Sequence, residues 1–183
     1  MTGLSLLAEE VGVNERTLRR AVTQGTLRGS RFTPRKLELP LHEREYVRRS
    51  WSLLSTLRTA LRTEHNVRFA LLFGSAATGT DTVDSDVDVL VYMRDARFER
   101  VVDLGTKLTR LAGRPIDVVE LEHAETDPSF LAQAVSDGRV LVDRENLWPR
   151  LRRRETALRR HGDREDTQRL QMALAGIDRL LAA

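Results

Sequence analysis

Two aspartates lie two residues apart at the start of a hydrophobic segment, Val87 to Tyr92. Alternate residues of a strand project from one face, so Asp86 and Asp88 would lie about 7 Å apart along the backbone. A second hydrophobic segment, Ile116 to Leu121, carries Asp117 near its start. Neighbouring carboxylates repel each other, and a hard divalent cation relieves that repulsion. If the two segments are neighbouring strands, the sequence predicts a divalent-metal site formed by three aspartates.

Residues suited to binding phosphate come before this pair. Gly74 and Ser75 follow the apolar segment Phe69 to Phe73 and open a short helix in our prediction. A glycine lets the backbone approach a phosphate, a serine adds a donor, and free N–H groups at a helix start attract anions. We therefore expect Gly74 and Ser75 to bind a nucleotide, together with Ser85 beside the aspartates.

A phosphate cradle beside metal-binding carboxylates points to phosphoryl or nucleotidyl transfer. In the two-metal scheme one ion orients the triphosphate and the other lowers the pKa of the attacking hydroxyl. Asp117 is the candidate to bind the second ion and to accept the proton, while Asp86 and Asp88 would bridge both ions.

Other interpretations of the aspartate pair fit less well. An Asp-x-Asp in a turn is most often a solvated loop, but here it adjoins an apolar strand and follows Gly-Ser by ten residues. An EF-hand beginning at Asp84 would need glycine where Val89 stands. Neither a Walker phosphate loop nor a Gly-x-Gly-x-x-Gly run occurs in the chain.

With Gly74-Ser75, the spacing of ten residues, Asp86-Val87-Asp88 and the later Asp117, the stretch from Val67 to Asp143 resembles the polymerase β-type nucleotidyltransferases, specifically their minimal nucleotidyltransferase branch. The resemblance covers about two-fifths of the chain. It implies a small mixed sheet flanked by helices, with two Mg²⁺ ions on the three catalytic aspartates. It also implies transfer of a nucleoside monophosphate, AMP from ATP as we expect, with release of pyrophosphate.

The same resemblance implies partners. Many members of the branch are antitoxins that adenylylate a partner ribonuclease of HEPN type, related enzymes modify tRNA ends as toxins, and others modify antibiotics. We therefore expect a toxin–antitoxin or defence module, with a HEPN-type toxin or a tRNA as the acceptor.

One departure from the branch favours a second hypothesis. Ala76 and Thr78 stand where such proteins often carry arginines. Either Arg68 or arginines of the segment 152–154 supply the missing charge, or the domain is weakly active or inactive and binds a partner. In the second case the chain would be a DNA-binding autoregulator or antitoxin.

The N-terminal segment predicts a helix-turn-helix. Apolar residues recur at helical spacing over Leu4 to Val11 and over Glu15 to Gln24, with Gly12 in the turn and Asn14 as a cap. A short β-ribbon, or wing, is expected over residues 26–39, and it carries further basic residues. The second helix would present four side chains to an operator DNA: Arg16, Arg19, Arg20 and Gln24. Helix pairs with arginine-rich faces also bind protein, and that alternative stays open.

Charge is unevenly distributed along the chain. The net charge is +3, but residues 1–50 and 147–183 each carry +4, and residues 51–146 carry −5. Only two of the 30 basic residues are lysines, and arginine suits phosphate and bases, although a GC-rich genome also favours it. The absence of cysteine excludes disulfides, thiol catalysis and cysteine-ligated metals. The four histidines show no metal-ligand spacing.

These patterns predict an α/β (α+β) protein in four parts. We expect a helix-turn-helix over residues 1–40, a connecting helix over 41–64, a nucleotidyltransferase domain over 65–146 and a helical segment over 147–183. The last segment is expected as one or two packing or dimer-contact helices with a break near His161 and Gly162. No apolar run is long enough to cross a bilayer, so we expect no membrane partner and a cytoplasmic location.

Overall fold

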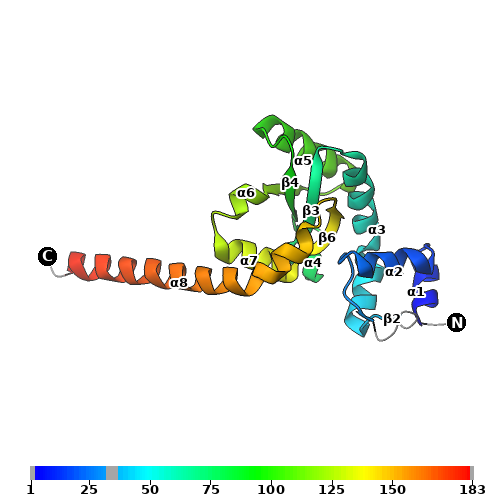
Figure 1. Ribbon diagram of the computed structural model, residues 1–183, viewed down its shortest axis with the longest axis horizontal. Coiled ribbons are helices and arrows are strands. Elements are labelled where there is room, and N and C mark those ends of the chain that lie inside the picture. Colours follow the sequence, from blue (N-terminus) through cyan, green and yellow to red (C-terminus); the bar gives the residue numbers. More distant parts are fainter. Residues whose placement is uncertain (1–2, 32–36, 182–183) are drawn as a thin grey trace.

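The computed structural model describes residues 3–31 and 37–181. A central sheet with helices on both faces forms the body of the molecule, two short N-terminal helices lie beside it, and a long C-terminal helix extends away from it (Figure 1). In the part of the chain that is described, no helix combines the length and the apolar character needed to cross a membrane.

The N-terminal unit has the predicted pair of helices. Helix α1 spans Gly3–Glu10 and α2 spans Glu15–Thr23. Gly12 takes the left-handed backbone conformation that the turn requires, with φ +70°. The Asn14 side chain caps α2 by accepting the Arg16 N–H at 2.7 Å. Strands β1, Ser30–Arg31, and β2, Leu37–Glu38, pair antiparallel, while the tip of the expected wing, residues 32–36, lies outside the described residues.

Helix α3, Leu41–Thr63, leads into a sheet of four strands. These are β3, Val67–Phe73; β4, Val87–Met93; β5, Ile116–Glu120; and β6, Arg139–Asp143. Their order is β5-β4-β3-β6, with β5 parallel to β4 and the other two pairs antiparallel. This is the mixed sheet that the sequence resemblance implies, with β5 and β6 as its edge strands.

Five further helices complete the fold around this sheet. They are α4, Gly74–Thr78; α5, Phe98–Ala112; α6, Leu121–Ala124; α7, Pro128–Asp137; and α8, Leu147–Leu181. Buried side chains of α3 and α5 pack on one face of the sheet, and those of α6, α7 and the start of α8 pack on the other. Alternate residues of β3 point to the two faces, so Ala70 and Leu72 join the first core and Leu71 and Phe73 the second.

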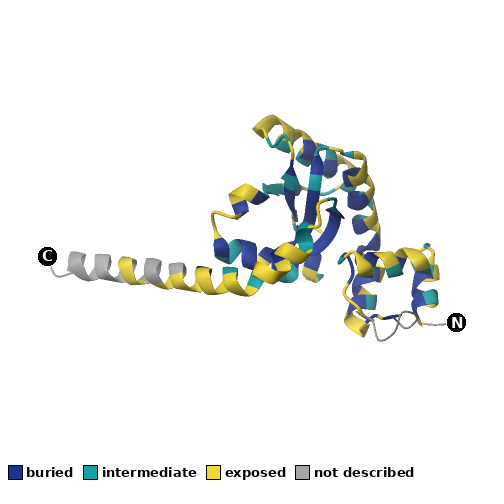
Figure 2. Ribbon diagram, in the orientation of Figure 1, coloured by how far each residue is buried: buried dark blue, intermediate teal, exposed yellow. Residues whose placement is uncertain are grey.

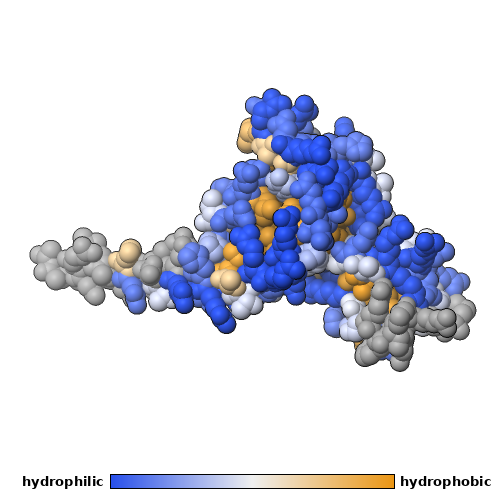
Figure 3. Space-filling model, in the orientation of Figure 1, coloured by the Kyte–Doolittle hydropathy of each residue, from blue (hydrophilic) through white to orange (hydrophobic). Residues whose placement is uncertain are grey.

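Figure 2 shows the buried residues gathered on the strands and on the helix faces that cover them, while the far part of α8 is largely exposed or not described. In Figure 3 hydrophobic side chains come to the surface around α6, α7 and β4 and again beside the N-terminal helices, while most of this face is hydrophilic. The body of the molecule is thus a sheet with a core on each side.

Two details differ from the sequence-based prediction. Helix α8 continues without a break through His161 and Gly162. Gly162 is tolerated there because it packs against Ser129 of α7, where a larger residue would collide with the Ser129 backbone. Helix α6 was not predicted, since its four residues are too few to show a helical period.

A buried ion pair joins α3 to the sheet. The guanidinium of Arg139, 1% exposed, contacts both carboxylate oxygens of Glu43 in α3, at 2.6 and 2.9 Å. It also donates to the carbonyls of Ala77 at 2.6 Å and Thr26 at 3.3 Å, and it stacks 3.5 Å from the centre of the Tyr46 ring. One arginine of β6 therefore contacts α3, α4 and the N-terminal unit.

Backbone contacts strengthen this junction. The Val140 N–H donates to the Gly25 carbonyl at 3.1 Å, and the Thr26 hydroxyl donates to the Val140 carbonyl at 2.6 Å. The Arg28 guanidinium donates to the Asp137 carbonyl at 2.6 Å. The segment after α2 thus covers the β6 edge and satisfies polar groups that an open edge strand would expose.

Candidate active site

The strand register brings two of the predicted aspartates together. Strands β4 and β5 are parallel neighbours, and Asp88 is the register partner of Asp117. Side chains at paired positions of adjacent strands project from the same face of the sheet. Asp86 precedes β4 by one residue at the same end of the sheet, so the expected neighbouring strands are confirmed.

The three carboxylates interact electrostatically. Burial raises the pKa of Asp88, and the negative charges of Asp117 and Asp86 raise it further. Asp88 is half-buried, whereas Asp86 and Asp117 are exposed. In residues 3–31 and 37–181, no three histidine or acidic side chains lie close enough together to form a complete set of metal ligands. The arrangement is a set of repelling carboxylate oxygens, the donor type that Mg²⁺ prefers, at one edge of the sheet.

Gly74 lies directly against this set. It follows Phe73, whose register partner on β4 is Asp88. Its φ is +68°, and a Cβ atom at this position would collide with an oxygen of the Asp88 carboxylate. Glycine is therefore required at position 74 for two reasons, the positive φ of the backbone and the close approach of the turn to Asp88.

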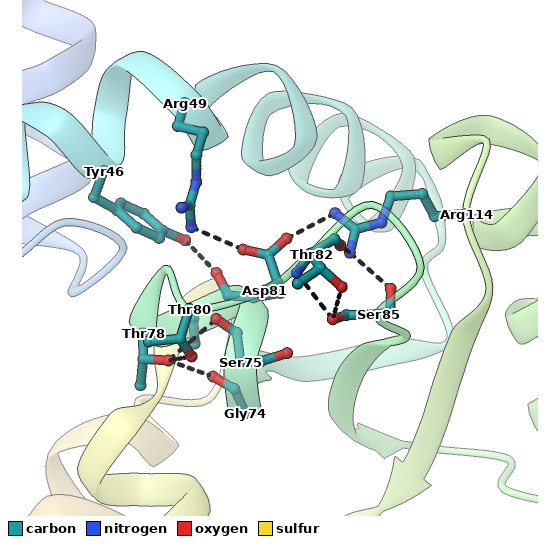
Figure 4. A network of polar contacts seen from close by, with 12 residues as sticks. Tyr46, Arg49, Gly74, Ser75, Thr78, Thr80, Asp81, Thr82, Ser85 and Arg114 are labelled. Atoms are coloured by element: carbon teal, nitrogen blue, oxygen red, sulfur yellow. Dashed lines mark hydrogen bonds and ion pairs between the residues drawn. The ribbon is translucent and has the colours of Figure 1, made fainter.

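The turn after β3 is ordered by hydrogen bonds. The Ser75 carbonyl accepts the N–H groups of Gly79 and Thr80, at 2.9 and 3.0 Å, and the Thr78 hydroxyl at 3.1 Å (Figure 4). The Ser75 hydroxyl has no hydrogen-bond partner among the described residues and is only half-buried. It is a donor available to a ligand beside Gly74.

Ser85 has a different environment from Ser75. Its hydroxyl accepts the Thr82 N–H at 2.9 Å and contacts the Thr82 hydroxyl at 3.0 Å, and its carbonyl accepts from Arg114 at 2.7 Å. These contacts shape the loop between α4 and β4. The expectation that Ser85 binds nucleotide stays a prediction, and its side chain already has partners within the loop.

Two arginines that the sequence analysis did not single out hold the same loop. Asp81 accepts from Arg49 of α3 and from Arg114, which precedes β5, at 2.8 Å in both cases (Figure 4). Arg49 also lies close to Gly79, the residue that ends α4. The two arginines share one carboxylate, so together with Asp81 they carry one net positive charge next to the three aspartates. The sequence held no signal for this pairing, because Arg49 and Asp81 are far apart in the chain.

The arginines expected to replace those missing at Ala76 and Thr78 lie elsewhere. Arg68 is near the start of β3, about 20 Å along the strand from Gly74, and pairs with Glu145. Arg152 and Arg154 pair with Glu155 and Glu125. Ala76 is buried, so a longer side chain at this position would have to displace its neighbours. Of the candidate charges, only Arg49 and Arg114 lie beside the turn.

The four residues expected to contact DNA differ in their surroundings. Arg16 and Arg20 are exposed and, within the described part of the chain, no carboxylate pairs with them. Arg19 forms an ion pair with Glu15 at 2.6 Å, and Gln24 accepts a hydrogen bond from Arg58 of α3. Two of the four side chains are therefore free to contact a ligand and two already contact neighbours.

Comparison with known proteins agrees with this geometry. Residues 55–147 match the family model "Polymerase beta, Nucleotidyltransferase". The chain is 36% identical over 88 residues to MJ0604 of Methanocaldococcus jannaschii, which is named for protein adenylyltransferase activity; the match covers 45% of this chain and 87% of that protein. The chain belongs to the polymerase β-type nucleotidyltransferase family, as its motif predicted, and it is a nucleotidyltransferase.

Solved structures share the fold. One is an MNT antitoxin in complex with the tri-AMPylated HEPN toxin of Shewanella oneidensis, with a TM-score of 0.54, 18% identity and coverage of 68% of this chain and 98% of that chain. Another is the toxin–antitoxin MntA-HepT, with a TM-score of 0.53, 18% identity and the same coverage of 68% and 98%. These similarities support the fold that the minimal nucleotidyltransferase branch implies.

Proposed function

We propose that this nucleotidyltransferase uses Mg²⁺ and ATP to transfer AMP to a hydroxyl group of a protein acceptor. The register pairing of Asp88 with Asp117, next to the Gly74 turn, is the observation that carries the proposal. The name of the archaeal relative and the adenylylated toxin bound to an antitoxin of the same fold support the choice of adenylyl group and of acceptor.

The chemistry of the donor set fits Mg²⁺. Asp86, Asp88 and Asp117 would hold the metal, since each offers carboxylate oxygens and each adds negative charge that a cation would offset. When bound, Mg²⁺ neutralises phosphate charge and lowers the pKa of the acceptor hydroxyl.

The chain's own residues then have distinct roles. The Gly74 turn and the Ser75 hydroxyl bind the phosphates, and Arg49 and Arg114 add positive charge beside them. The acceptor oxygen forms a bond to the α-phosphorus, the bond to the leaving pyrophosphate breaks, and Asp117 takes the proton of the acceptor hydroxyl.

Transfer of labelled nucleotide tests the proposal. The protein is incubated with Mg²⁺ and each labelled nucleoside triphosphate in turn, with and without the protein encoded by the neighbouring gene. We expect label from ATP on that partner, and Asp88→Ala or Asp117→Ala to lower the rate by a factor of about 10² to 10³ or more. Asp103→Ala, which removes an exposed carboxylate of α5, is the matched control and keeps the wild-type rate.

The acceptor is decided in the same experiment. We propose a toxin of HEPN type, by analogy with the complex of similar fold. Label that appears on added tRNA and not on the protein would replace the protein acceptor by RNA. If no nucleotide is transferred to either, or if Asp88→Ala matches the wild type, the proposed function is wrong.

A second activity is proposed for the N-terminal unit, which is DNA binding through α2. The exposed and unpaired Arg16 and Arg20 support it, because arginines on such a helix contact phosphates and base edges. A duplex from the upstream region of the gene should shift in a gel at low salt, and Arg16→Gln with Arg20→Gln should abolish that shift. Absence of a shift at low salt would contradict the proposal. Arg110→Gln, which removes an exposed charge of α5, is the control.

A further inference from the structure

A pocket of about 460 Å³ lies between α2 and α3, away from the aspartates. One wall is the face of α3 that carries Trp51, Arg58 and Arg62. The other is one side of α2 with the residue that caps it, and it includes Arg16 and Arg20. The volume is in the range of small-molecule pockets, which measure about 300 to 1,000 Å³.

The charge in this pocket is all of one sign. Arg16, Arg20, Arg58 and Arg62 line it, and no aspartate or glutamate does. Among the residues the structure describes, none of these four guanidinium groups has a carboxylate partner, whereas Arg19 of the same helix α2 is paired with Glu15. The pocket therefore holds a concentration of positive charge that nothing in the described protein offsets.

Arg58 is the unusual member of the group. It is 7% exposed, and its Nε is buried with no hydrogen-bond partner in the described structure. Burial and the positive charges of Arg62 and Arg20 lower its pKa to about 10. A buried polar group without a partner costs free energy, so this arrangement destabilises the protein unless a ligand completes it.

Three hydroxyl side chains complete the lining, from Thr17, Ser55 and Thr59. Guanidinium groups bind phosphate oxygens with paired hydrogen bonds, and hydroxyls add single donors. A duplex lies on the outside of a helix, whereas a pocket lined by Arg58 and Arg62 of α3 on one side and by Arg16 and Arg20 of α2 on the other suits a small anion that can enter between the two helices. We propose that the α2–α3 pocket binds a compact oligophosphate, at a site separate from the aspartates.

Inorganic tripolyphosphate is the probe, titrated calorimetrically into the full chain at low salt without divalent cations. We expect saturable binding of one equivalent, with Arg20→Gln and Arg62→Gln each weakening it at least tenfold. Both residues are exposed, so these variants should fold, and their melting temperatures verify it. Arg110→Gln on α5 removes the same charge outside the pocket and should leave binding unchanged.

Arg58→Met is the decisive variant, because methionine preserves the packing of the long side chain without its charge. It should abolish tripolyphosphate binding while the far-ultraviolet circular dichroism stays that of the wild type. Equal weakening by Arg110→Gln, or no weakening by Arg20→Gln and Arg62→Gln, would overturn the proposal. So would binding of a 20-base-pair duplex without binding of tripolyphosphate, which would assign the arginines to nucleic acid.

Discussion

Two clusters of charge in this molecule are built in opposite ways. At the junction of β6 and α3, Arg139 and Glu43 are almost wholly buried and every charge has its counterpart. At the end of the sheet where β4 and β5 begin, Asp86, Asp88 and Asp117 repel one another, and burial together with this repulsion raises the pKa of Asp88. The matched cluster joins parts of the fold, whereas the unmatched one is suited to a ligand of opposite sign.

The α2–α3 pocket is the cationic counterpart of the cluster formed by Asp86, Asp88 and Asp117. Both concentrate one sign of charge in a partly buried place, where like charges cost stability. A protein keeps a destabilising cluster of like charges where that cluster binds a ligand, because function and stability favour different arrangements. In this molecule, charges with partners hold elements of the fold together, and charges without partners mark the two places suited to binding a ligand.

The largest effect is expected from breaking the matched cluster. Arg139→Met leaves the Glu43 carboxylate buried without its cation, which should lower the free energy of unfolding by about 3–5 kcal/mol, measured by urea denaturation. Arg48→Met breaks an exposed ion pair with Glu10 and should lower the free energy of unfolding far less, because water screens that pair. Adding Glu43→Leu to Arg139→Met should recover most of the loss. Equal costs for the buried and exposed pairs would show that burial does not distinguish them.

An intermediate effect on stability and activity is expected at Gly74, where the backbone approaches the carboxylate of Asp88. Gly74→Ala should cost about 1–2 kcal/mol for the positive φ and should also displace the Asp88 carboxylate, so nucleotidyl transfer falls with stability. Gly12→Ala is matched in φ, at +70°, but its Cβ would meet no atom within 4 Å. It should lose similar stability and keep the transfer rate. If both variants keep the rate, the contact of Gly74 with Asp88 has no part in the activity.

The smallest effect is a gain in stability. Because the pKa of Asp88 is raised in the folded protein, its ionised form is disfavoured there, and folding bears that cost at neutral pH. The cost is lost as the pH falls through the raised pKa toward the ordinary value of about 3.9. Asp88→Asn should therefore raise the melting temperature at pH 7 by about 1–3 °C, and the gain should vanish near pH 3. A lower melting temperature at pH 7 would mean that Asp88 supports the fold.

Short-range features of the molecule could be predicted without coordinates. The helices α1 to α3, the Asn14 cap of α2 and the strand before Gly74 follow from periodicity and from residues next to each other in the chain. The family was also predictable, because its motif consists of a few residues at definite spacing. The uninterrupted α8 was not, since the tolerance of Gly162 depends on Ser129 of another helix.

The amino-acid sequence by itself determined the types of element, the family and the aspartates that form its motif. Only the tertiary structure decided which charges are matched, because Arg139 and Glu43 lie 96 residues apart and meet through packing of β6 on α3. The same holds for Arg49 with Asp81 and for the arginines of the α2–α3 pocket. Local hydrogen bonding is encoded within a few residues, whereas the partner of a charged side chain depends on how distant elements pack.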